Sequence, residues 1–555
     1  MLRRGGAPVT ERGARRVAAA TVAAAALVWV VAAQRSQGVA RDEVVYMRAG
    51  SNYAAWWIDA VRGVPGARTA RRIEAVFGGR PGGSANPEHP PLMKTLFGFS
   101  ERLFHDRLGW MSELTAYRFP TAVMAALLVA LIVSFAGRVW GWTTGAVAGA
   151  LALLMPRTLF HAGLAAFDLP VMTLWVATLY CYWRALAARR WCVALAVAFG
   201  CALATKHNAL MLPAVVAPHY AYVAWRRHRH IRGLWRLRPS IWGALAVGGP
   251  LVLFASWPHL WVDPIGHAAE WIGFHLRHVH YNYEYLGRNW NAPPFPWHVP
   301  LVTTALVVPV ATLAAAVIGA VALAARARAG NAADADRAPA LLLSLSAAVA
   351  IGPFVLRTTP IFGAEKHWMP AFATLAVFAA VGVRAAALAA ARAAWPAATR
   401  RHGAAVAAVA IAVVAAAAVE TVDAHPYALS HYNALAGGAP GGADLGMNRQ
   451  FWGYAARGVL SVLAERAAAR NRWRVYTHDA QPAWPVYARA GLIPPKLRDS
   501  GRELPGIRAS DFALVIHELH FNRHDYMVWK TYGTVQPIYV LRTDGVPIVS
   551  VYERP

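Results

Sequence analysis

The hydrophobic positions of the chain fall into long uninterrupted runs separated by short polar segments. The runs are about 15 to 20 residues long, rich in Ala, Val and Leu and almost free of charge, which is the length that a helix needs to cross a membrane. A helix at the surface of a soluble core would instead carry a polar face. The pattern predicts eleven membrane spans, at about residues 17–34, 118–137, 142–157, 169–187, 191–205, 209–225, 240–257, 299–325, 339–356, 368–388 and 404–419.

The basic residues between these runs predict an orientation. Arginines precede the first predicted span and recur in every second connection, at 188–190, 226–238, 326–337 and 392–401. Cytoplasmic loops are enriched in Lys and Arg, and an odd number of spans places the two termini on opposite sides. We therefore expect a multi-pass protein of the plasma (inner) membrane, with a cytoplasmic N-terminus that remains as an uncleaved first span.

The polar segments on the predicted outer side are longer and differ in composition. The first outer loop, 35–117, has mixed charge, and the tail from residue 420 loses its Ala-rich runs. In the tail, Trp473–Thr477, Phe512–Ile516, Gln536–Leu541 and Pro547–Tyr552 resemble strands, and Thr543-Asp544-Gly545 is typical of a hairpin turn. We predict an all-α membrane domain over 1–419 and a small extracytoplasmic α/β domain over 420–555.

Composition narrows the function classes. Hydrophobic residues make up 57% of the 555 positions, mean hydropathy is +0.34 and the net charge is +27. Because the basic residues lie at span ends rather than on a soluble face, they suit anionic lipid at a membrane surface and argue against a nucleic-acid partner. The cysteines, Cys181, Cys192 and Cys201, lie in predicted spans without CxxC spacing, so neither a disulfide nor a zinc framework is indicated.

Polar side chains at the outer ends of the spans are the candidates for chemistry, since desolvating them is costly. Asp42 and Glu43 follow the first span, where a carboxylate could act as a general base or, alternatively, the pair could bind a divalent cation. A plain solvated helix end explains the same pair. Asp168 lies at the start of the fourth span. It could likewise take part in the chemistry, or it could be a plain carboxylate at the boundary of the span.

Lys and Arg residues also gather at the predicted outer side, although such residues are usually enriched on the cytoplasmic side. Lys94 follows the Asn86–Met93 segment on what looks like an amphipathic helix, where an ammonium could meet a phosphate. The other candidates for a phosphate partner are Lys206, Arg357 and Lys366. Interfacial anchoring by long basic side chains is the alternative explanation.

Four histidines in the third outer loop raise the question of zinc. They are His267, His275, His278 and His280, and they are interleaved with aromatic residues. Because no tight HxxxH or HExxH motif is present, an amphipathic helix lying on the membrane explains the pattern better than a metal site. We predict no metal-ligand set, while a divalent cation at the acidic pair stays open as a cofactor.

Taken together and in their order, these motifs resemble the GT-C class of polytopic glycosyltransferases, and within it family 39. That family includes protein O-mannosyltransferases and the aminoarabinose transferases of lipid A. The resemblance runs through most of residues 17–453, and it rests on Asp42-Glu43, His89-Pro-Pro-Leu-Met-Lys94, Arg118-Phe-Pro, Asp168-Leu-Pro170, Ala204-Thr-Lys-His-Asn-Ala-Leu, Glu365-Lys-His-Trp-Met-Pro and His425-Pro-Tyr through Asn433. Gln450-Phe-Trp-Gly-Tyr departs from the Trp-Gly-Gln that relatives often carry.

The resemblance implies transfer of a sugar from a polyprenyl-phosphate carrier to a hydroxyl of a protein, lipid or glycan acceptor at the outer face. It implies inversion, with Asp42 as general base and with Glu43 and Asp168 in the catalytic group. Lys94, Lys206, Arg357 and Lys366 are then expected to bind the carrier phosphate. His89 and His367 are expected in substrate-binding loops.

Two other functions fit a chain with many spans. A transporter or lipid flippase would place charges near the membrane midplane, often in repeated halves, whereas here the charges gather at one surface and no repeat is seen. A non-catalytic assembly or sensor protein would bind a partner through the outer C-terminal domain.

Overall fold

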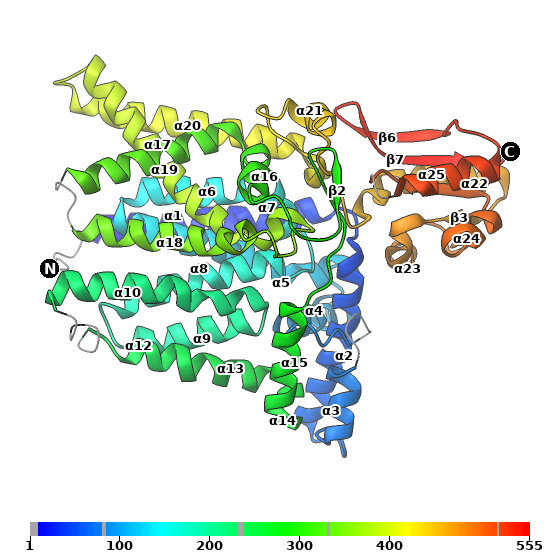
Figure 1. The fold of residues 1–555 in the computed structure, drawn as a ribbon, viewed down its shortest axis with the longest axis horizontal. Coiled ribbons are helices and arrows are strands. Elements are labelled where there is room, and N and C mark those ends of the chain that lie inside the picture. Colours follow the sequence, from blue (N-terminus) through cyan, green and yellow to red (C-terminus); the bar gives the residue numbers. More distant parts are fainter. Residues whose placement is uncertain (1–8, 80–84, 231–232, 234–236, 330–333, 519–520) are drawn as a thin grey trace.

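The computed structural model describes residues 9–79, 85–230, 233, 237–329, 334–518 and 521–555. It consists of a helix bundle, a layer of short helices at one end of the bundle, and a five-stranded sheet domain beyond that layer (Figure 1). The described N-terminal end lies at one end of the bundle and the C-terminal sheet at the other (Figure 1).

Each predicted apolar run coincides with a helix or with a pair of helices. The bundle helices are α1 (Val9–Gln34), α5 (Glu113–Val139), α6 (Trp142–Leu153), α7 (Pro156–Ala162), α8 (Asp168–Ala185), α9 (Trp191–Leu203), α10 (Leu212–His228), α12 (Ser240–Gly243), α13 (Gly249–Ser256), α16 (Val299–Val307), α17 (Val310–Arg328), α18 (Asp334–Val355), α19 (Pro370–Ala394) and α20 (Thr399–Asp423). Within the described residues, six helices are long and apolar enough to cross a membrane, or seven if the bent pair α6 and α7 counts as one span. The chain is thus a multi-pass membrane protein, and the count of eleven stays a prediction.

Prolines explain two departures from the predicted spans. The run 299–325 is wrong as a single helix, because it breaks between α16 and α17 at Val308-Pro309. A proline disfavours the helical conformation in the residue before it, and Val308 is indeed extended, with φ −88° and ψ 136°. Similarly, α7 starts at Pro156 and is bent by 75° from α6. That bend turns the residues after Met155 across the end of the bundle.

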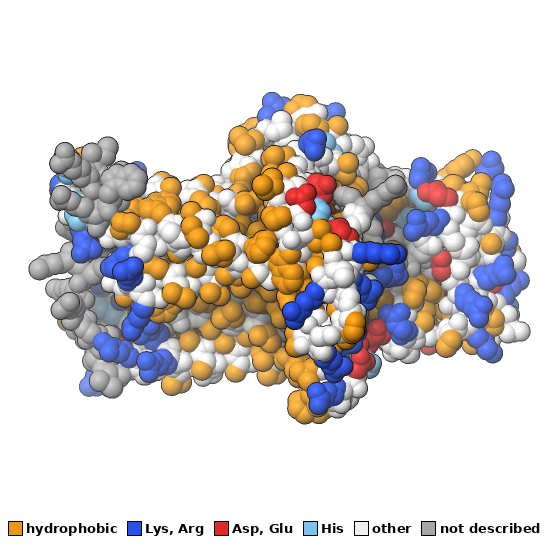
Figure 2. Space-filling view, turned by 90° about the horizontal axis from the view of Figure 1, so that it is seen from below, with side chains coloured by type: hydrophobic (Ala, Val, Ile, Leu, Met, Phe, Trp, Pro, Cys, Tyr) orange, Lys and Arg blue, Asp and Glu red, His pale blue; other side chains and the backbone are white. Residues whose placement is uncertain are grey.

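The side chains at the surface also differ between the sides of the bundle and its ends. Hydrophobic side chains cover the sides of the bundle, and charged side chains gather toward its two ends (Figure 2). Large apolar side chains on this exposed surface include Val193, Val247, Leu251, Val317, Val321 and Ile411. Such a surface suits hydrocarbon rather than water.

The segment predicted to form the first outer loop is mostly helical. It contains α2 (Arg41–Arg62), α3 (Ala70–Phe77), α4 (Leu92–Glu101) and a π-helical turn, η1 (Arg102–Arg107). The α2 and α4 helices cross closely at Gly50 and Gly98, where a Cβ atom on Gly98 would lie 2.1 Å from the Gly50 carbonyl oxygen. Two glycines therefore fix α4, and the loop before it, against α2.

The segment predicted to form the third outer loop lies beside the first one, at the same end of the bundle (Figure 1). It contains α14 (His259–Val262), α15 (Pro264–Leu276) and a short hairpin of β1 (Tyr283–Tyr285) and β2 (Arg288–Trp290). The α15 helix starts at a capping residue, because the Asp263 carboxylate accepts a hydrogen bond of 2.9 Å from the Gly266 N–H.

The C-terminal domain is an α/β layer structure. Its strands are β3 (Arg474–Tyr476), β4 (Arg498–Asp499), β5 (Phe512–Ile516), β6 (Tyr539–Thr543) and β7 (Val546–Glu553), in the order β4-β3-β5-β7-β6. Its helices are α21 (Gly438–Asp444), α22 (Leu460–Arg470), α23 (Trp484–Arg489), α24 (Glu503–Ala509) and α25 (Asn522–Tyr532). The four predicted strands and the hairpin turn are confirmed, with Asp544 and Gly545 both at positive φ, whereas β4 was not predicted.

Helices cover both faces of this sheet, which explains why every residue of β5 is buried. One face packs against α24 and α25 through Ile507, Val528 and Tyr532. The other face shares a hydrophobic core with Val39, Tyr46 and other residues at the beginning of α2. The N-terminal turn of α2, with the predicted acidic pair, therefore lies between the helix bundle and the sheet domain.

Candidate functional site

Asp42 and Glu43 are neighbours in the first turn of α2, but the structure gives them different surroundings. The Asp42 side chain is 31% exposed and its nearest cation is Arg41, whose Nε lies 3.7 Å away. Arg41 is held mainly by Asp479 of the C-terminal domain, at 2.8 Å. Asp42 thus keeps a carboxylate that a substrate can reach.

Glu43 is completely buried and fully hydrogen-bonded. Its two oxygens accept from Nε and Nη2 of Arg118, both at 2.8 Å, and from the backbone N–H groups of Ala165 (2.7 Å) and Ala40 (2.9 Å). Arg118 also donates to the carbonyls of Gln34, Gln37 and Gly38. The pair joins the end of α1, the start of α2, α5 and the segment before α8, so Glu43 holds Asp42 in place.

Among the candidate cations, Lys366 is the one whose ammonium is least engaged by neighbouring residues. It lies in a 3₁₀ turn, η4 (Ala364–His367), and it is only 7% exposed. Its ammonium lies 4.3 Å above the Trp452 ring and 5.3 Å from that of Phe362. Among the described residues, no carboxylate or carbonyl oxygen lies within hydrogen-bonding distance of it. A buried ammonium with unused donors is ready for an anionic ligand.

Lys366 interacts electrostatically with two of the acidic candidates. Burial lowers the pKa of Lys366, and the carboxylates of Asp42 and Asp168 oppose this effect. The structure therefore brings Asp42, Asp168 and Lys366 within electrostatic reach of one another, although Asp42 and Lys366 are more than 300 residues apart in the sequence.

Asp168 and Lys206 form a close ion pair in the same region. Lys206 Nζ lies 2.6 Å from Asp168 Oδ1, and His161 Nδ1 lies 3.6 Å from the other carboxylate oxygen. Both His161 nitrogens are buried without a hydrogen-bond partner in the described part of the chain. Because Asp168 already neutralises much of the Lys206 charge, Lys206 is a weaker anion site than Lys366.

Arg157 and Glu365 form a further buried pair that sequence reasoning missed. Arg157 donates to Glu365 Oε2 at 2.8 Å and to the His431 carbonyl at 3.2 Å, and its guanidinium lies 5.1 Å from the Tyr432 ring. The pair joins α7 to η4, which carries Lys366. A lone arginine at the edge of an apolar run was the available signal.

Trp452 is a further residue to which the sequence assigned no role. It has a positive φ of 75°, and its carbonyl accepts from the Arg41 N–H at 2.9 Å. Its ring covers Lys366 and contacts His161 edge-on. The stretch that departed from the family pattern thus supplies the aromatic wall of the site.

Lys94 differs from the prediction of a free phosphate ligand. It is fully buried, and it donates to the carbonyls of Asn86 (2.6 Å) and His89 (2.8 Å) and to Asn86 Oδ1 (3.2 Å). An ammonium has three protons, and these acceptors take them all. Burial lowers the pKa of Lys94 to about 7. In this arrangement Lys94 holds the loop before α4.

The remaining predicted residues lie around the cluster or away from it. His89 packs between Tyr46, Phe167 and His275, and His367 Nε2 donates to the Phe362 carbonyl at 2.8 Å. Arg357 is exposed and hydrogen-bonds the Phe295 carbonyl. The structure does not bring Arg357 into contact with the acidic pair.

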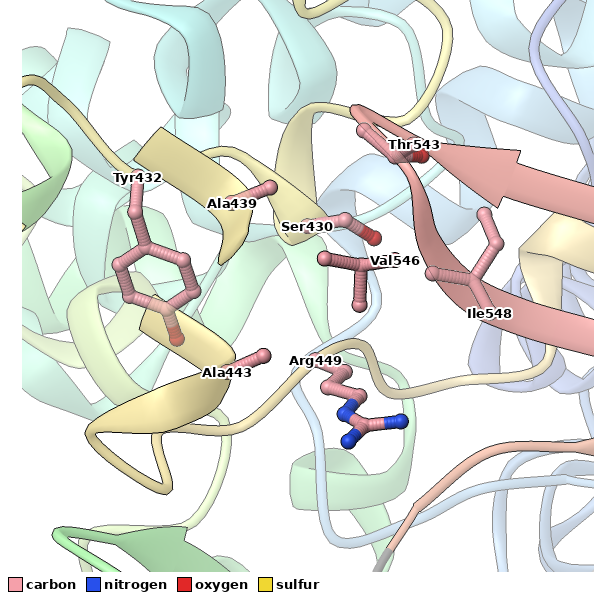
Figure 3. A pocket seen from close by; sticks show the side chains of 8 residues that line it. All are labelled: Ser430, Tyr432, Ala439, Ala443, Arg449, Thr543, Val546 and Ile548. Atoms are coloured by element: carbon pink, nitrogen blue, oxygen red, sulfur yellow. The ribbon is translucent and has the colours of Figure 1, made fainter. Parts of the chain in front are cut away.

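Two cavities in the C-terminal half lie apart from this cluster. One, of about 10 Å³, lies between α21 and the β6–β7 hairpin, and Arg449 is its one charged lining residue (Figure 3). It has room for a water molecule rather than a sugar. The other, of about 570 Å³, lies at the β4 edge of the sheet and is lined by Trp473, Arg474, Lys496, Arg498, Asp499, Ser500 and Ala509.

Comparison with known proteins supports the resemblance. A family model described as "Dolichyl-phosphate-mannose-protein mannosyltransferase" matches residues 88–257, which include His89, Lys94, Asp168 and Lys206 but neither Asp42 nor Lys366. A search of curated proteins finds no match.

The chain is also similar to solved structures. The oligosaccharyltransferase of Archaeoglobus fulgidus in its apo form is 11% identical over 93% of this chain and 72% of that chain, with a TM-score of 0.50. ArnT from Cupriavidus metallidurans bound to undecaprenyl phosphate is 17% identical over 96% and 97%, with a TM-score of 0.47. The family model supports the resemblance to the GT-C class over residues 88–257, and the likeness to the oligosaccharyltransferase shows a shared fold.

Proposed function

We propose that this chain is a glycosyltransferase that moves a sugar from a polyprenyl-phosphate carrier to a hydroxyl acceptor at the outer face of the membrane. One observation carries the proposal: an accessible carboxylate, Asp42, acts electrostatically on Lys366, a buried side chain whose ammonium has no hydrogen-bond acceptor in the described chain. The family model adds a lipid-phosphate sugar as the donor class.

The reaction assigns one task to each of these two groups. Asp42 accepts the proton of the acceptor hydroxyl while the oxygen of that hydroxyl attacks the anomeric carbon of the sugar. The bond from that carbon to the phosphate oxygen breaks on the opposite side, so the configuration inverts and polyprenyl phosphate leaves. Lys366 lies where it can stabilise the charge that develops on the phosphate, and a low-dielectric site strengthens this interaction.

The neighbouring ion pairs position these groups. Glu43 with Arg118 fixes the start of α2, and Arg157 with Glu365 fixes η4. Lys206, held by Asp168, adds positive potential near the phosphate. We assign Lys94 and His89 to the substrate loop, and we leave Arg357 out of the catalytic group because it contacts Phe295 instead.

The distribution of charge supports an outer-face reaction. The helix ends that border the Arg-rich connections, at α10, α17 and α19, lie at the end of the bundle opposite to the cluster (Figure 1), and cytoplasmic loops are enriched in such basic residues. We therefore place the N-terminus in the cytoplasm of the inner membrane and the cluster outside. No nucleotide site is required, because the donor is already attached to lipid.

The test is turnover of a lipid-linked donor by purified protein in detergent. Polyprenyl-phosphate mannose and polyprenyl-phosphate aminoarabinose are supplied with an envelope extract as acceptor, and released polyprenyl phosphate is measured. Asp42→Asn keeps the size of the side chain but removes its basicity, so turnover should fall about 10²- to 10⁴-fold. Asp59→Asn, on the same helix, is the matched control and should keep normal turnover.

Two results would contradict the proposal. Near-normal transfer by a well-folded Asp42→Asn protein would exclude Asp42 as the base and make Asp168 the next candidate. Movement of either donor across a reconstituted bilayer without release of polyprenyl phosphate would instead favour the transporter or flippase.

A further inference from the structure

A basic pocket lies at the edge of the C-terminal sheet, apart from the acidic cluster. Its volume is about 570 Å³, which is within the usual range for pockets that hold small ligands. Strands β3 and β4 carry most of its lining residues, and Ala509 at the end of α24 adds to them. We propose that this β4-edge pocket binds an acidic saccharide, that is, a sugar with a phosphate or carboxylate group.

Three cations of the pocket have no partner in the protein. Arg474, Lys496 and Arg498 are exposed, and among the described residues none of their side chains forms an ion pair or donates a hydrogen bond. The lining contains a single carboxylate, that of Asp499. The pocket therefore has an excess of positive charge that an anionic ligand can neutralise.

Two of these cations lie side by side. Arg474 and Arg498 are direct partners in the parallel pairing of β3 with β4, so their side chains project to the same face from strands about 4.8 Å apart. Like charges directly opposite one another destabilise a sheet. Basic residues on an edge strand can prevent aggregation, but this reason does not apply to Arg474, because β3 lies between β4 and β5. An anion bound between the two guanidiniums would relieve their repulsion.

Hydrogen bonds fix the frame that carries these charges. The Arg498 N–H donates to the Trp473 carbonyl at 2.8 Å. One residue earlier, the Leu497 carbonyl accepts from Trp484 Nε1 of α23 at 2.9 Å. A ligand thus meets cations on an ordered backbone, which lowers the entropy cost of binding.

Trp473 gives the pocket an aromatic wall and favours a sugar over a bare anion. Its ring is half-buried, its Nε1 donates to Asn471 Oδ1 at 2.9 Å, and the Lys496 ammonium lies 5.7 Å from the ring centroid. The C–H groups of a sugar ring form an apolar face that packs on an indole. A sugar in this position would direct its acidic group toward the cations.

Asp499 leaves an acceptor for a sugar hydroxyl. Its carboxylate accepts from neutral donors only, namely Thr477 Oγ1 at 2.6 Å, Gln481 Nε2 at 2.8 Å and the Gly501 N–H at 3.2 Å. An ionised carboxylate has about four lone-pair sites, so one more hydroxyl can donate to it. Recognition of both a hydroxyl and an acidic group is what an acidic saccharide requires.

The place of the pocket in the fold argues against a phospholipid headgroup as the ligand. The pocket belongs to the sheet domain, and the layer of short helices lies between this domain and the bundle (Figure 1). A glycan that extends from the membrane surface can reach beyond this layer. The inference does not depend on the proposed glycosyl transfer, because its readout is binding.

The experiment measures binding to the full-length protein in detergent by fluorescence polarisation. The probe is labelled phosphorylated mannopentaose, and the competitors are pentagalacturonate, unphosphorylated mannopentaose, inorganic phosphate and a hexa-aspartate peptide. Binding of either acidic saccharide supports the proposal, and the tighter one identifies the acidic group. We expect the neutral sugar and inorganic phosphate to bind at least about 10-fold more weakly, because each lacks one part of the recognition.

Variants locate the binding in the pocket. Arg498→Gln removes a charge-assisted contact and should weaken binding about 10- to 100-fold without lowering Tm. Trp473→Leu keeps an apolar side chain and should also weaken binding. Lys530→Gln, an exposed cation on α25, is the matched control and should bind normally. In the wild-type protein, the bound saccharide should slow amide hydrogen exchange at residues 496–500.

Several results would overturn the proposal. These are no binding of either acidic saccharide to the wild-type protein, equal affinity for the neutral sugar or inorganic phosphate, and unchanged affinity of both Arg498→Gln and Trp473→Leu. Tighter binding of the hexa-aspartate peptide than of both acidic saccharides would assign the pocket to an acidic protein segment instead.

Discussion

The Glu43 carboxylate and the Arg118 guanidinium meet in two parallel contacts of 2.8 Å, and both side chains are completely buried. The pair lies directly behind Asp42, at the junction of α1, α2 and α5. Its position distinguishes the two members of the acidic pair: one supports the backbone, and the other faces the site.

Glu43→Gln should therefore reduce stability rather than chemistry. Removing one partner leaves the Arg118 charge buried and unpaired, which costs about 3–5 kcal/mol. We expect a clearly lower Tm in detergent and normal turnover per folded molecule. Glu113→Gln, which breaks the exposed pair with Arg489, is the control and should change stability by less than about 1 kcal/mol. Normal Tm with lost turnover would return Glu43 to the catalytic group.

Lys366→Met should impair use of the lipid donor. A charge-assisted contact to phosphate contributes about 1.5–3 kcal/mol, so kcat/KM for the donor should fall about 10- to 100-fold. Lys366→Arg keeps the charge and should recover part of the activity. Exposed Lys530 provides the control, Lys530→Met. Unchanged donor kinetics for Lys366→Met would remove this residue from the phosphate site.

Lys94→Met should behave differently from Lys366→Met. The substitution leaves the Asn86 and His89 carbonyls without their donor, and each buried unsatisfied group costs about 1–3 kcal/mol. We expect a lower Tm and an unchanged KM for the donor in the protein that remains folded. A normal Tm with a raised donor KM would restore Lys94 as a phosphate ligand.

Cysteine labelling tests the predicted orientation. In a chain whose native cysteines are replaced by alanine, Ser461→Cys on the exposed side of α22 should react with an impermeant thiol reagent in intact cells. Ala187→Cys, at an exposed position just after α8, should react only after lysis. The reverse pattern would place the C-terminal domain in the cytoplasm and exclude an outer-face reaction.

The stability of the C-terminal domain should depend on Asp525. Burial raises the pKa of this carboxyl to about 6, and its Oδ1 has no hydrogen-bond partner in the described residues. Because the folded state then binds more protons than the unfolded state between about pH 4 and 6, stability falls as the pH rises through this window. Above about pH 6 the carboxylate is charged in the folded protein, and the free-energy cost of burying that charge remains.

Asp525→Asn removes that penalty. At pH 7.5 we expect a gain of about 1 kcal/mol, reduced by the partial exposure of the side chain, whereas near pH 4 variant and wild type should unfold alike. Thermal unfolding at the two pH values measures the difference. Glu465→Gln, an exposed carboxylate of α22, should show no such pH-dependent gain. An equal effect of Asp525→Asn at both pH values would contradict the assignment.

The sequence by itself determined the elements whose signals are local. The apolar runs predicted the bundle helices, and alternation with a Thr543-Asp544-Gly545 turn predicted the β6–β7 hairpin, because span length and turn conformation depend on neighbouring residues. The motifs also selected Asp42, Asp168, Lys206 and Lys366, which the fold brings to one end of the bundle.

Only the tertiary structure decided what each charged group does. Lys94 and Lys366 look alike in the sequence, yet backbone carbonyls occupy one ammonium, and an aromatic ring covers the other. Glu43 is distinguished from Asp42 by Arg118, 75 positions away, and Trp452 reaches Lys366 from a stretch that matched no motif. These partners lie tens to hundreds of residues apart in the sequence. No pattern along the chain shows which of them the packing of the helices brings into contact.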